Sequence, residues 1–242
     1  MNGRNSIFSN IPVVTKNLII INFIIWLAMM VSPRISSWAM QYCSLHFYQA
    51  SDFNFAQLLT YMFMHSTRDF AHILFNMFTL FMFGITLERV LGSGRFLFYY
   101  VSCGIGAAVI QELVWGMTWE GIFAPMYGLT TDSFKAALAA GRVADLDMAL
   151  NFLQTVGASG AIYGVLLAFG MLFPNMPLFI MFIPVPIKAK WMVIGYGAIE
   201  LLIGLSQAHD GVAHFAHLGG MIFGFIMIWI WKKNGTLNVH PY

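Results

Sequence analysis

Long apolar runs separated by polar stretches dominate the pattern of this chain. Each run is close to the length that crosses the hydrocarbon layer of a bilayer. Since a backbone exposed to lipid must satisfy its own hydrogen bonds, we expect each run to form a helix. The six predicted helices cover residues 17–32, 71–88, 96–115, 157–173, 190–206 and 213–231.

Polar and proline-rich stretches separate the predicted helices. Residues 88–95 read Glu-Arg-Val-Leu-Gly-Ser-Gly-Arg and predict a tight turn, whereas prolines interrupt any helix across 174–186. Two connections are long, at 33–70 and 116–156. The first is rich in aromatic residues, which favours a structured loop at a membrane interface. The second carries a short amphipathic helical pattern at 132–140 with an acidic first residue.

The composition agrees with a membrane protein. Hydrophobic residues make up 59% of the chain and charged residues 9%, far below the roughly 25% charged of a soluble domain. A formal net charge of +2 and the lack of a long basic run argue against nucleic-acid binding. The two cysteines, Cys43 and Cys103, are predicted to stay unpaired, and no His/Cys cluster has metal-site spacing, so we predict no metal site.

Charge predicts the topology. The apolar run near the N-terminus is similar to a signal peptide, but its polar lead and the lack of a small-residue cleavage site favour a retained helix. An excess of Lys and Arg marks the cytoplasmic side of a membrane protein. When the connections are assigned to alternating sides, one side has eight such residues and the other four, which predicts that both termini are cytoplasmic and both long loops are outside. The eight are Arg4, Lys16, Arg89, Arg95, Lys188, Lys190, Lys232 and Lys233, and the four are Arg34, Arg68, Lys135 and Arg142.

Polar residues gather near the outer ends of three predicted helices. With this topology His72, Asn76, Ser159 and His217 all lie within about two turns of the outer boundary, at about 1.5 Å per residue. Each residue alone is more often a hydrogen-bonding or packing residue than a catalytic one. Because intramembrane polar groups are costly and usually face the bundle interior, their common depth favours a shared site.

A serine at this depth becomes a nucleophile only beside a base. Neutral imidazole suits that role, and both His214 and His217 qualify by residue type. We prefer His217 because of the glycines that follow it. Tyr163, one turn below Ser159, is placed to stack on the ring of His217 and hold its orientation.

Glycines predict close packing of the two helices that carry Ser159 and His217. Gly160 and Gly164 form one face of small residues, and Gly220 and Gly224 form another. Small residues let membrane helices approach closely, and we also count Gly157 among the packing residues. Such an approach would let a serine and an imidazole touch.

Stabilising an oxyanion requires hydrogen-bond donors near the serine. His72 and Asn76 are four residues apart on one helical face and both carry N–H groups. The backbone N–H of Ser159, near a helix N-terminus, has no intrahelical acceptor and adds a third donor. No acidic residue is expected in this layer, so a Ser-His dyad fits better than a triad.

Three other intramembrane or loop residues have no clear catalytic role. We interpret His65 and His214 as structural hydrogen-bonding residues. Glu200 is the least explained: a carboxylate inside a membrane is a functional candidate, but a protonated or hydrogen-bonded structural role fits as well, and we assign it none.

Several motifs together resemble the rhomboid intramembrane serine proteases. They are G-x-S-G at 157–160 with Tyr163, H-I-L-F-N at 72–76, the turn at 88–95, and A-H-x-x-G at 216–220. The resemblance covers roughly residues 55–231. It implies that Ser159 is the nucleophile, His217 the general base, and His72 and Asn76 oxyanion-stabilising residues. It further implies cleavage of single-pass membrane proteins near the outer end of their helix, without a cofactor.

The chain also departs from its apparent relatives. Many bacterial rhomboids carry a Trp-Arg pair in the first long loop, where this chain reads Gln-Leu-Leu-Thr-Tyr at 57–61, so the loop must be anchored differently. The loop at 116–156 is longer than in compact members. The predicted helix 190–206, with Trp191, Met192 and the stretch 206–209, together with the loop that follows, is a plausible substrate gate by resemblance.

We therefore expect an all-α, six-helix rhomboid-like bundle in a bacterial inner membrane. Residues 1–16 would form a short cytoplasmic N-terminus, 17–232 the membrane domain, and 233–242 a cytoplasmic tail. A catalytically inactive rhomboid-like protein that binds membrane clients is the main alternative. A transporter is less favoured, because no inverted repeat is visible and the polar residues stop at one layer. The sequence does not indicate the oligomeric state.

Overall fold

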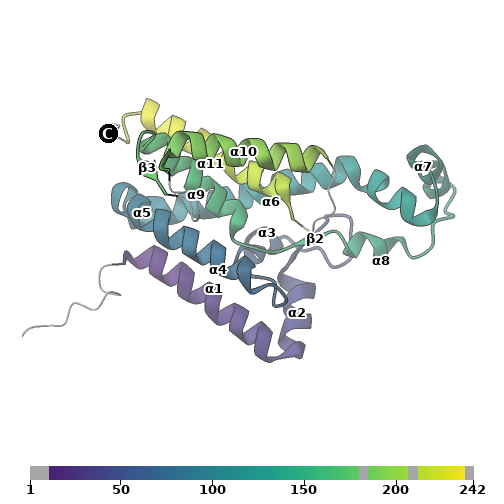
Figure 1. The fold of residues 1–242 in the computed structure, drawn as a ribbon. Coiled ribbons are helices and arrows are strands. Elements are labelled where there is room, and N and C mark those ends of the chain that lie inside the picture. The colour runs from purple at the N-terminus through teal and green to yellow at the C-terminus, as the bar shows by residue number, and fades with distance from the viewer. Residues whose placement is uncertain (1–10, 180–184, 207–211, 238–242) are drawn as a thin grey trace, which may run out of the picture.

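All six predicted apolar segments are helical in the computed structural model, which describes residues 11–179, 185–206 and 212–237 (Figure 1). These segments correspond to α1 (Val13–Val31), α4 (Phe70–Thr79) continued by the π-helical turn η3 (Leu80–Gly84) and α5 (Ile85–Leu91), α6 (Ser93–Phe123), α9 (Ser159–Leu172), α10 (Ala189–Leu205) and α11 (His214–Lys233). The fold is mostly helical, as predicted.

Short elements fill the two long connections and one turn. They are α2 (Pro33–Cys43), β1 (Leu45–His46), α3 (Gln57–Thr60), η2 (Tyr61–Phe63), η4 (Ala124–Tyr127), α7 (Thr131–Ala139), α8 (Leu146–Asn151), β2 (Gln154–Thr155), β3 (Pro177–Leu178) and β4 (Ile187–Lys188). The first loop is structured, as its aromatic content predicted, and α7 confirms the amphipathic helix expected at 132–140.

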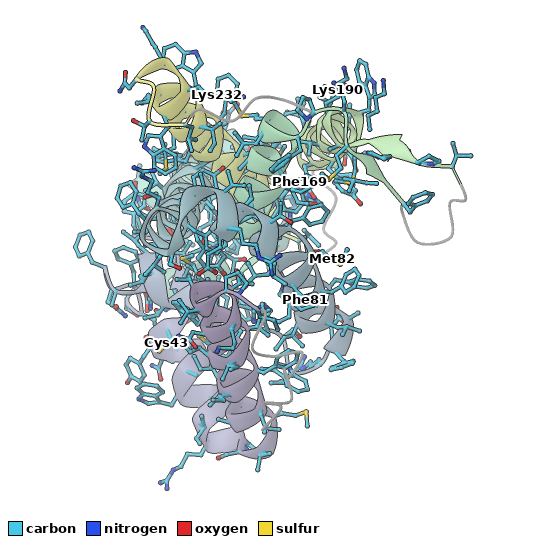
Figure 2. The ribbon with its side chains drawn as sticks, turned by 90° about the vertical axis from the view of Figure 1, so that its left-hand side faces the viewer. Cys43, Phe81, Met82, Phe169, Lys190 and Lys232 are labelled. Atoms are coloured by element: carbon cyan, nitrogen blue, oxygen red, sulfur yellow. The ribbon has the colours of Figure 1, made fainter. Side chains whose placement is uncertain are left out.

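Within the described residues, four helices are long and apolar enough to cross a membrane: Val13–Val31, Phe70–Leu91, Ser93–Tyr127 and His214–Lys233. Two further helices are shorter, α9 with 14 residues and α10 with 17. Large apolar side chains such as Phe81 and Met82 point outward from the bundle, as expected of surfaces that face lipid (Figure 2). Six membrane crossings and cytoplasmic termini stay predictions.

The predicted helix at 96–115 was too short at its C-terminal end. α6 continues to Phe123 and extends beyond its neighbours toward α7 (Figure 1). The apolar run ends near residue 115, but polarity alone does not stop a helix. The first proline after that point is Pro125, and the chain leaves the α-helix just before it.

Glycines set the distances between α6, α9 and α11 at the centre of the bundle. A Cβ on Gly220 of α11 would overlap the carbonyl oxygen of Gly160 on α9, and a Cβ on Gly164 would lie 2.5 Å from Sγ of Cys103 on α6. Gly224 meets the same face of α9 one turn further along. The close approach predicted for these two glycine faces is therefore present. Cys103 is buried and, like Cys43, is not in a disulfide, as predicted.

The two long loops lie at the same end of the bundle and are hydrogen-bonded to each other. β1 from the first loop pairs antiparallel with β2 from the second, with Leu45 opposite Thr155. Gln57 anchors the first loop: its buried side chain accepts a hydrogen bond from the backbone N–H of His46 at 3.1 Å and donates one to the carbonyl of Asp52 at 2.8 Å. This amide supplies the different anchoring that the sequence required.

The opposite end carries the α5–α6 turn and the β3–β4 hairpin. Figure 2 views the molecule from this end, with Lys190 on α10 and Lys232 on α11 near its upper edge. Nζ of Lys232 donates to the carbonyl of Met171, near the end of α9, at 2.8 Å. The turn predicted at 88–95 is present, with Gly92 at a positive φ of 78° between α5 and α6.

Candidate active site

Ser159 and His217 meet at the end of the bundle that carries the two long loops. Oγ of Ser159 and Nε2 of His217 are 2.8 Å apart. Ser159 is the first residue of α9, and His217 lies in the first turn of α11. The glycine contacts described above bring the two helix starts close enough for this hydrogen bond.

Tyr163 lies one turn below Ser159 and stacks on His217. The ring centroids are 4.3 Å apart and the rings are nearly parallel, with an interplanar angle of 7°. This is the ring contact expected from the sequence. The flat contact restricts rotation of the imidazole about its χ2 bond.

Glu200 lies in the same layer, so our expectation that no acidic residue shares it was wrong. Oε2 of Glu200 is 2.6 Å from Nδ1 of His214 and 3.0 Å from Nδ1 of His217. The hydroxyl of Tyr163 donates a hydrogen bond to the other carboxylate oxygen, Oε1. Glu200 is five residues from Leu205, where α10 ends, which is about 7 to 8 Å along the axis.

The carboxylate defines the protonation of the nearer imidazole. A carboxylate only accepts hydrogen bonds, so Nδ1 of His214 carries the proton that it donates to Glu200. His214 is thus a structural hydrogen-bonding residue, as predicted. Nδ1 of His217 lies within ion-pair distance of the same oxygen but has no partner in hydrogen-bond geometry among the described residues.

His72 on α4 and Ser159 on α9 both lie close to Gly157. The backbone N–H of Ser66 donates a long 3.5 Å hydrogen bond to Nδ1 of His72, which leaves the proton of a neutral ring on Nε2. A Cβ on Gly157 would lie 2.9 Å from this Nε2 and 3.5 Å from Oγ of Ser159. A side chain at position 157 would therefore crowd the ring of His72.

Gly157 does not pack two helices together, which corrects the sequence prediction. It precedes α9, has a positive φ of 137°, and its backbone N–H donates to the carbonyl of Tyr61 at 3.0 Å. Only glycine adopts such a conformation readily. Its role is to make the turn into α9 while leaving room for His72.

Asn76 is buried one turn after His72 on the same helix. One N–H of its side chain donates to the carbonyl of His72 at 2.7 Å. The amide group has a second N–H, so this hydrogen bond does not use its whole donor capacity. Together with the first backbone N–H of α9, which has no intrahelical acceptor, three donors belong to this end of the bundle.

His65 differs from its predicted hydrogen-bonding role. It is fully buried, and neither ring nitrogen has a hydrogen-bond partner among the described residues. Its ring contacts that of His72, with centroids 5.0 Å apart. Burial, and secondarily the neighbouring His72, lower the pKa of His65 to about 3, so this imidazole is neutral at physiological pH.

Glu200, His214 and His217 are also residue types that bind metal ions, with ligand atoms within 4.8 Å of one another. We predicted no metal here from sequence spacing. The short contacts of the carboxylate with His214 and Tyr163 would have to be broken before an ion could bind.

The structure describes only some of the residues expected at a substrate gate. Trp191 is exposed and Met192 is buried, whereas 207–209 lie outside the described residues.

Comparison with known proteins decides the family. The family model named Rhomboid domain matches residues 52–234. The chain belongs to the rhomboid family. Because the rhomboid domain contains several apolar helices of membrane-spanning length, the protein is a multi-pass integral membrane protein.

Two curated relatives are similar to this chain over part of its length. The mitochondrial rhomboid protein 1 of Saccharomyces cerevisiae is 25% identical over 168 residues, which cover 69% of this chain and 40% of the relative. The rhomboid protease AarA of Providencia stuartii is 28% identical over 176 residues, covering 69% of this chain and 52% of the relative. The chain thus spans about half or less of the length of each relative.

Proposed function

We propose that this rhomboid protein is an intramembrane serine endopeptidase with Ser159 as nucleophile and His217 as general base. The hydrogen bond of 2.8 Å between their side chains carries the proposal. A serine hydroxyl is a weak nucleophile without an adjacent base, and an imidazole within hydrogen-bond reach supplies one. The family match and the printed name of the relative AarA support the same activity.

The reaction begins with transfer of the hydroxyl proton of Ser159 to Nε2 of His217. Oγ forms a bond to the carbonyl carbon of the substrate peptide, and the carbonyl oxygen becomes an oxyanion. The backbone N–H of Ser159, Nε2–H of His72 and the second N–H of Asn76 stabilise that charge. His217 then returns the proton to the leaving amine as the C–N bond breaks, which gives an acyl-enzyme.

Water completes the cycle. It reaches the acyl-enzyme from the loop end of the bundle, because Ser159 begins its helix there and is only half buried. His217 takes a proton from this water as its oxygen attacks the ester carbon, and the proton passes to Oγ of Ser159 when the ester bond breaks. No cofactor takes part in this mechanism.

The substrates that fit this location are single-pass membrane proteins cleaved near the outer end of their helix. A peptide bond within a regular helix is shielded by its own hydrogen bonds, so a locally unwound segment must reach Ser159. The excess of Lys and Arg counted along the sequence supports cytoplasmic termini. Six crossings and a bacterial inner membrane belong to the same proposal.

An inactive rhomboid protein that binds membrane clients is the alternative function. It would share the fold and the exposed apolar surfaces but would not need a paired serine and histidine. The Ser159–His217 contact, the stacked Tyr163 and the donors from α4 favour the protease.

Reconstitution into liposomes with a single-pass substrate tests the proposal. Ser159→Ala and His217→Ala are expected to abolish cleavage and labelling by a fluorophosphonate, whereas Ser37→Ala, which removes an exposed hydroxyl on α2, should behave as wild type. Cleavage by Ser159→Ala at the wild-type rate would exclude the assigned nucleophile. Lack of cleavage and labelling by the wild type with a panel of substrates would favour the client-binding alternative.

Asn76→Ala tests the oxyanion role. We expect kcat to fall about 10-fold to 1000-fold, the range for loss of one such donor. Asn22→Ala is a matched control, because Asn22 on α1 also donates to the carbonyl four residues earlier at 2.7 Å but lies on a different helix from the site. Equal kcat values for the two variants would restrict Asn76 to a structural role.

A further inference from the structure

Glu200 is a buried carboxylate whose hydrogen-bonding and ion-pair partners, among the described residues, all lie in the candidate site. It is 7% exposed on α10, and burying a charge in apolar surroundings is costly unless hydrogen-bonding or charged partners compensate. The partners here are two imidazoles and one phenol, from two other helices. A carboxylate needed only for helix packing would be satisfied by any donors, whereas the groups around this one include the base itself.

The imidazole of His217 lies between a hydroxyl and this carboxylate. Nε2 faces Oγ of Ser159 at 2.8 Å, and Nδ1 faces Oε2 of Glu200 at 3.0 Å. Serine, imidazole and carboxylate thus follow one another in the order of a Ser-His-acid triad. In the resting arrangement Nδ1 is close to the carboxylate but outside hydrogen-bond geometry, so a small rotation or shift completes the contact.

The carboxylate itself is held from both sides. His214, one turn before His217 on α11, donates to Oε2 at 2.6 Å. Tyr163, one turn after Ser159 on α9, donates to Oε1. Each helix therefore presents one residue that forms the Ser159–His217 pair and one that fixes the orientation of Glu200.

We propose that Glu200 is a positioning residue that holds His217 in the tautomer and orientation needed to accept the proton of Ser159. The proposal rests on the proposed function. When Nε2 takes the serine proton, the ring becomes an imidazolium with N–H groups on both sides. The ionised carboxylate then faces the new positive charge and stays unprotonated, while the proton goes to the leaving amine. The protein would accordingly use a triad with its acid on a third helix.

Glu200→Gln is the decisive variant, because it keeps the size of the side chain and removes the charge. Its amide N–H groups can donate toward Nδ1 and favour the tautomer with the proton on Nε2, which cannot accept from Ser159. We expect kcat and the rate of fluorophosphonate labelling to fall at least 100-fold, with KM changed less than threefold, by analogy with loss of the acid in other triads. Glu88→Gln is the matched control, since it makes the same change at a buried carboxylate on α5.

A double-mutant cycle separates positioning from general destabilisation. Tyr163→Phe removes the hydroxyl that donates to Glu200 but keeps the ring that stacks on His217. If the hydroxyl acts through the carboxylate, the double variant Glu200→Gln/Tyr163→Phe should have the same kcat as Glu200→Gln alone. Additive losses in kcat would overturn the proposal.

The outcomes also separate this inference from the proposed function. A Glu200→Gln enzyme with wild-type kcat, beside an inactive Ser159→Ala enzyme, would leave the Ser-His dyad in place and exclude the positioning role. Cleavage by Ser159→Ala would instead overturn the proposed function. Thermal unfolding of each variant in the same detergent identifies any that fail to fold, and Tyr163→Phe provides an independent test if Glu200→Gln is among them.

Discussion

Two buried carboxylates, at opposite ends of the bundle, have very different neighbours. Glu88 is 2% exposed and accepts hydrogen bonds from the backbone N–H groups of Val14 and Thr15 at 2.9 and 2.7 Å. Hydroxyls of Thr15 and Ser93 donate at 2.8 and 2.7 Å. None of these donors titrates near neutral pH. Glu88 therefore joins the start of α1 to the α5–α6 turn, and its role is structural.

Glu200 is also buried but contacts groups that exchange protons. Burial alone thus fails to distinguish a structural carboxylate from a functional one. The chemistry of the partners does distinguish them. Backbone amides and hydroxyls only hold a carboxylate in place, whereas an imidazole that also contacts a serine can transmit the charge of the carboxylate to the nucleophile. The comparison predicts that changes near Glu200 affect the reaction and changes near Glu88 affect stability.

Gly220→Ala should have the largest effect, because it acts on the distance between α9 and α11. The new Cβ would overlap the carbonyl of Gly160, a backbone atom that cannot rotate away. We expect labelling of Ser159 to fall more than 100-fold and the free energy of unfolding to fall by about 1 to 3 kcal/mol, as for other overpacked sites. Gly195→Ala is the control, since its Cβ would meet no atom within 4 Å. Wild-type labelling of Gly220→Ala would show that the site does not depend on this close approach.

Glu88→Ala should lower the free energy of unfolding and leave kcat nearly unchanged. Removing the carboxylate leaves buried donors on α1 without an acceptor, and we expect a loss of about 3 kcal/mol or more in the free energy of unfolding. The kcat of the folded fraction should stay within twofold of wild type. Glu120→Ala is the control: its partly exposed ion pair with Lys135, at 3.4 Å, should contribute less than about 1 kcal/mol. A large loss of kcat in folded Glu88→Ala would contradict the distinction between a structural Glu88 and a functional Glu200.

The smallest expected effect is the contribution of His65 to the pH dependence of stability. Its pKa is about 3 in the folded protein and 6.5 ordinarily, so the unfolded chain binds a proton that the folded protein does not. Stability should therefore fall as the pH drops below 6.5, by about 1.4 kcal/mol per pH unit. Thermal unfolding of the wild type and His65→Leu at pH 7.5 and 5.5 measures this, and the variant should lose less stability than the wild type. Equal losses would assign the acid sensitivity to other groups.

Much of the fold could be predicted from the sequence because hydrocarbon imposes simple rules. Continuous apolar runs gave the six helices, and the glycine spacing gave the close faces of α9 and α11. Helix ends were less predictable: α6 extends into the polar region, since a helix there needs only the absence of a breaker. The π-helical turn η3 left no clear pattern in the residues that form it.

The candidate site was predictable for residues that lie close to the outer end of a predicted helix. Ser159, His217, His72 and Asn76 each lie within two turns of such an end, so their common depth followed from counting. Glu200 was discussed as an intramembrane carboxylate, but its place in the layer of Ser159 and His217 was not predicted. Which way its side chain points depends on the rotation of α10, and no spacing within one helix gives that. The available signal was the carboxylate itself, because a charge inside a membrane protein needs hydrogen-bonding or charged partners nearby.

The 14 residues of α9 span about 21 Å, whereas the hydrocarbon core of a bilayer is about 30 Å thick. If its far end is level with one face of that core, Ser159 lies roughly 9 Å beneath the other. The length of α9 thus sets the depth of Ser159 in the bilayer. It would select the peptide bond for cleavage by its distance below the lipid headgroups, with side-chain identity as a second criterion.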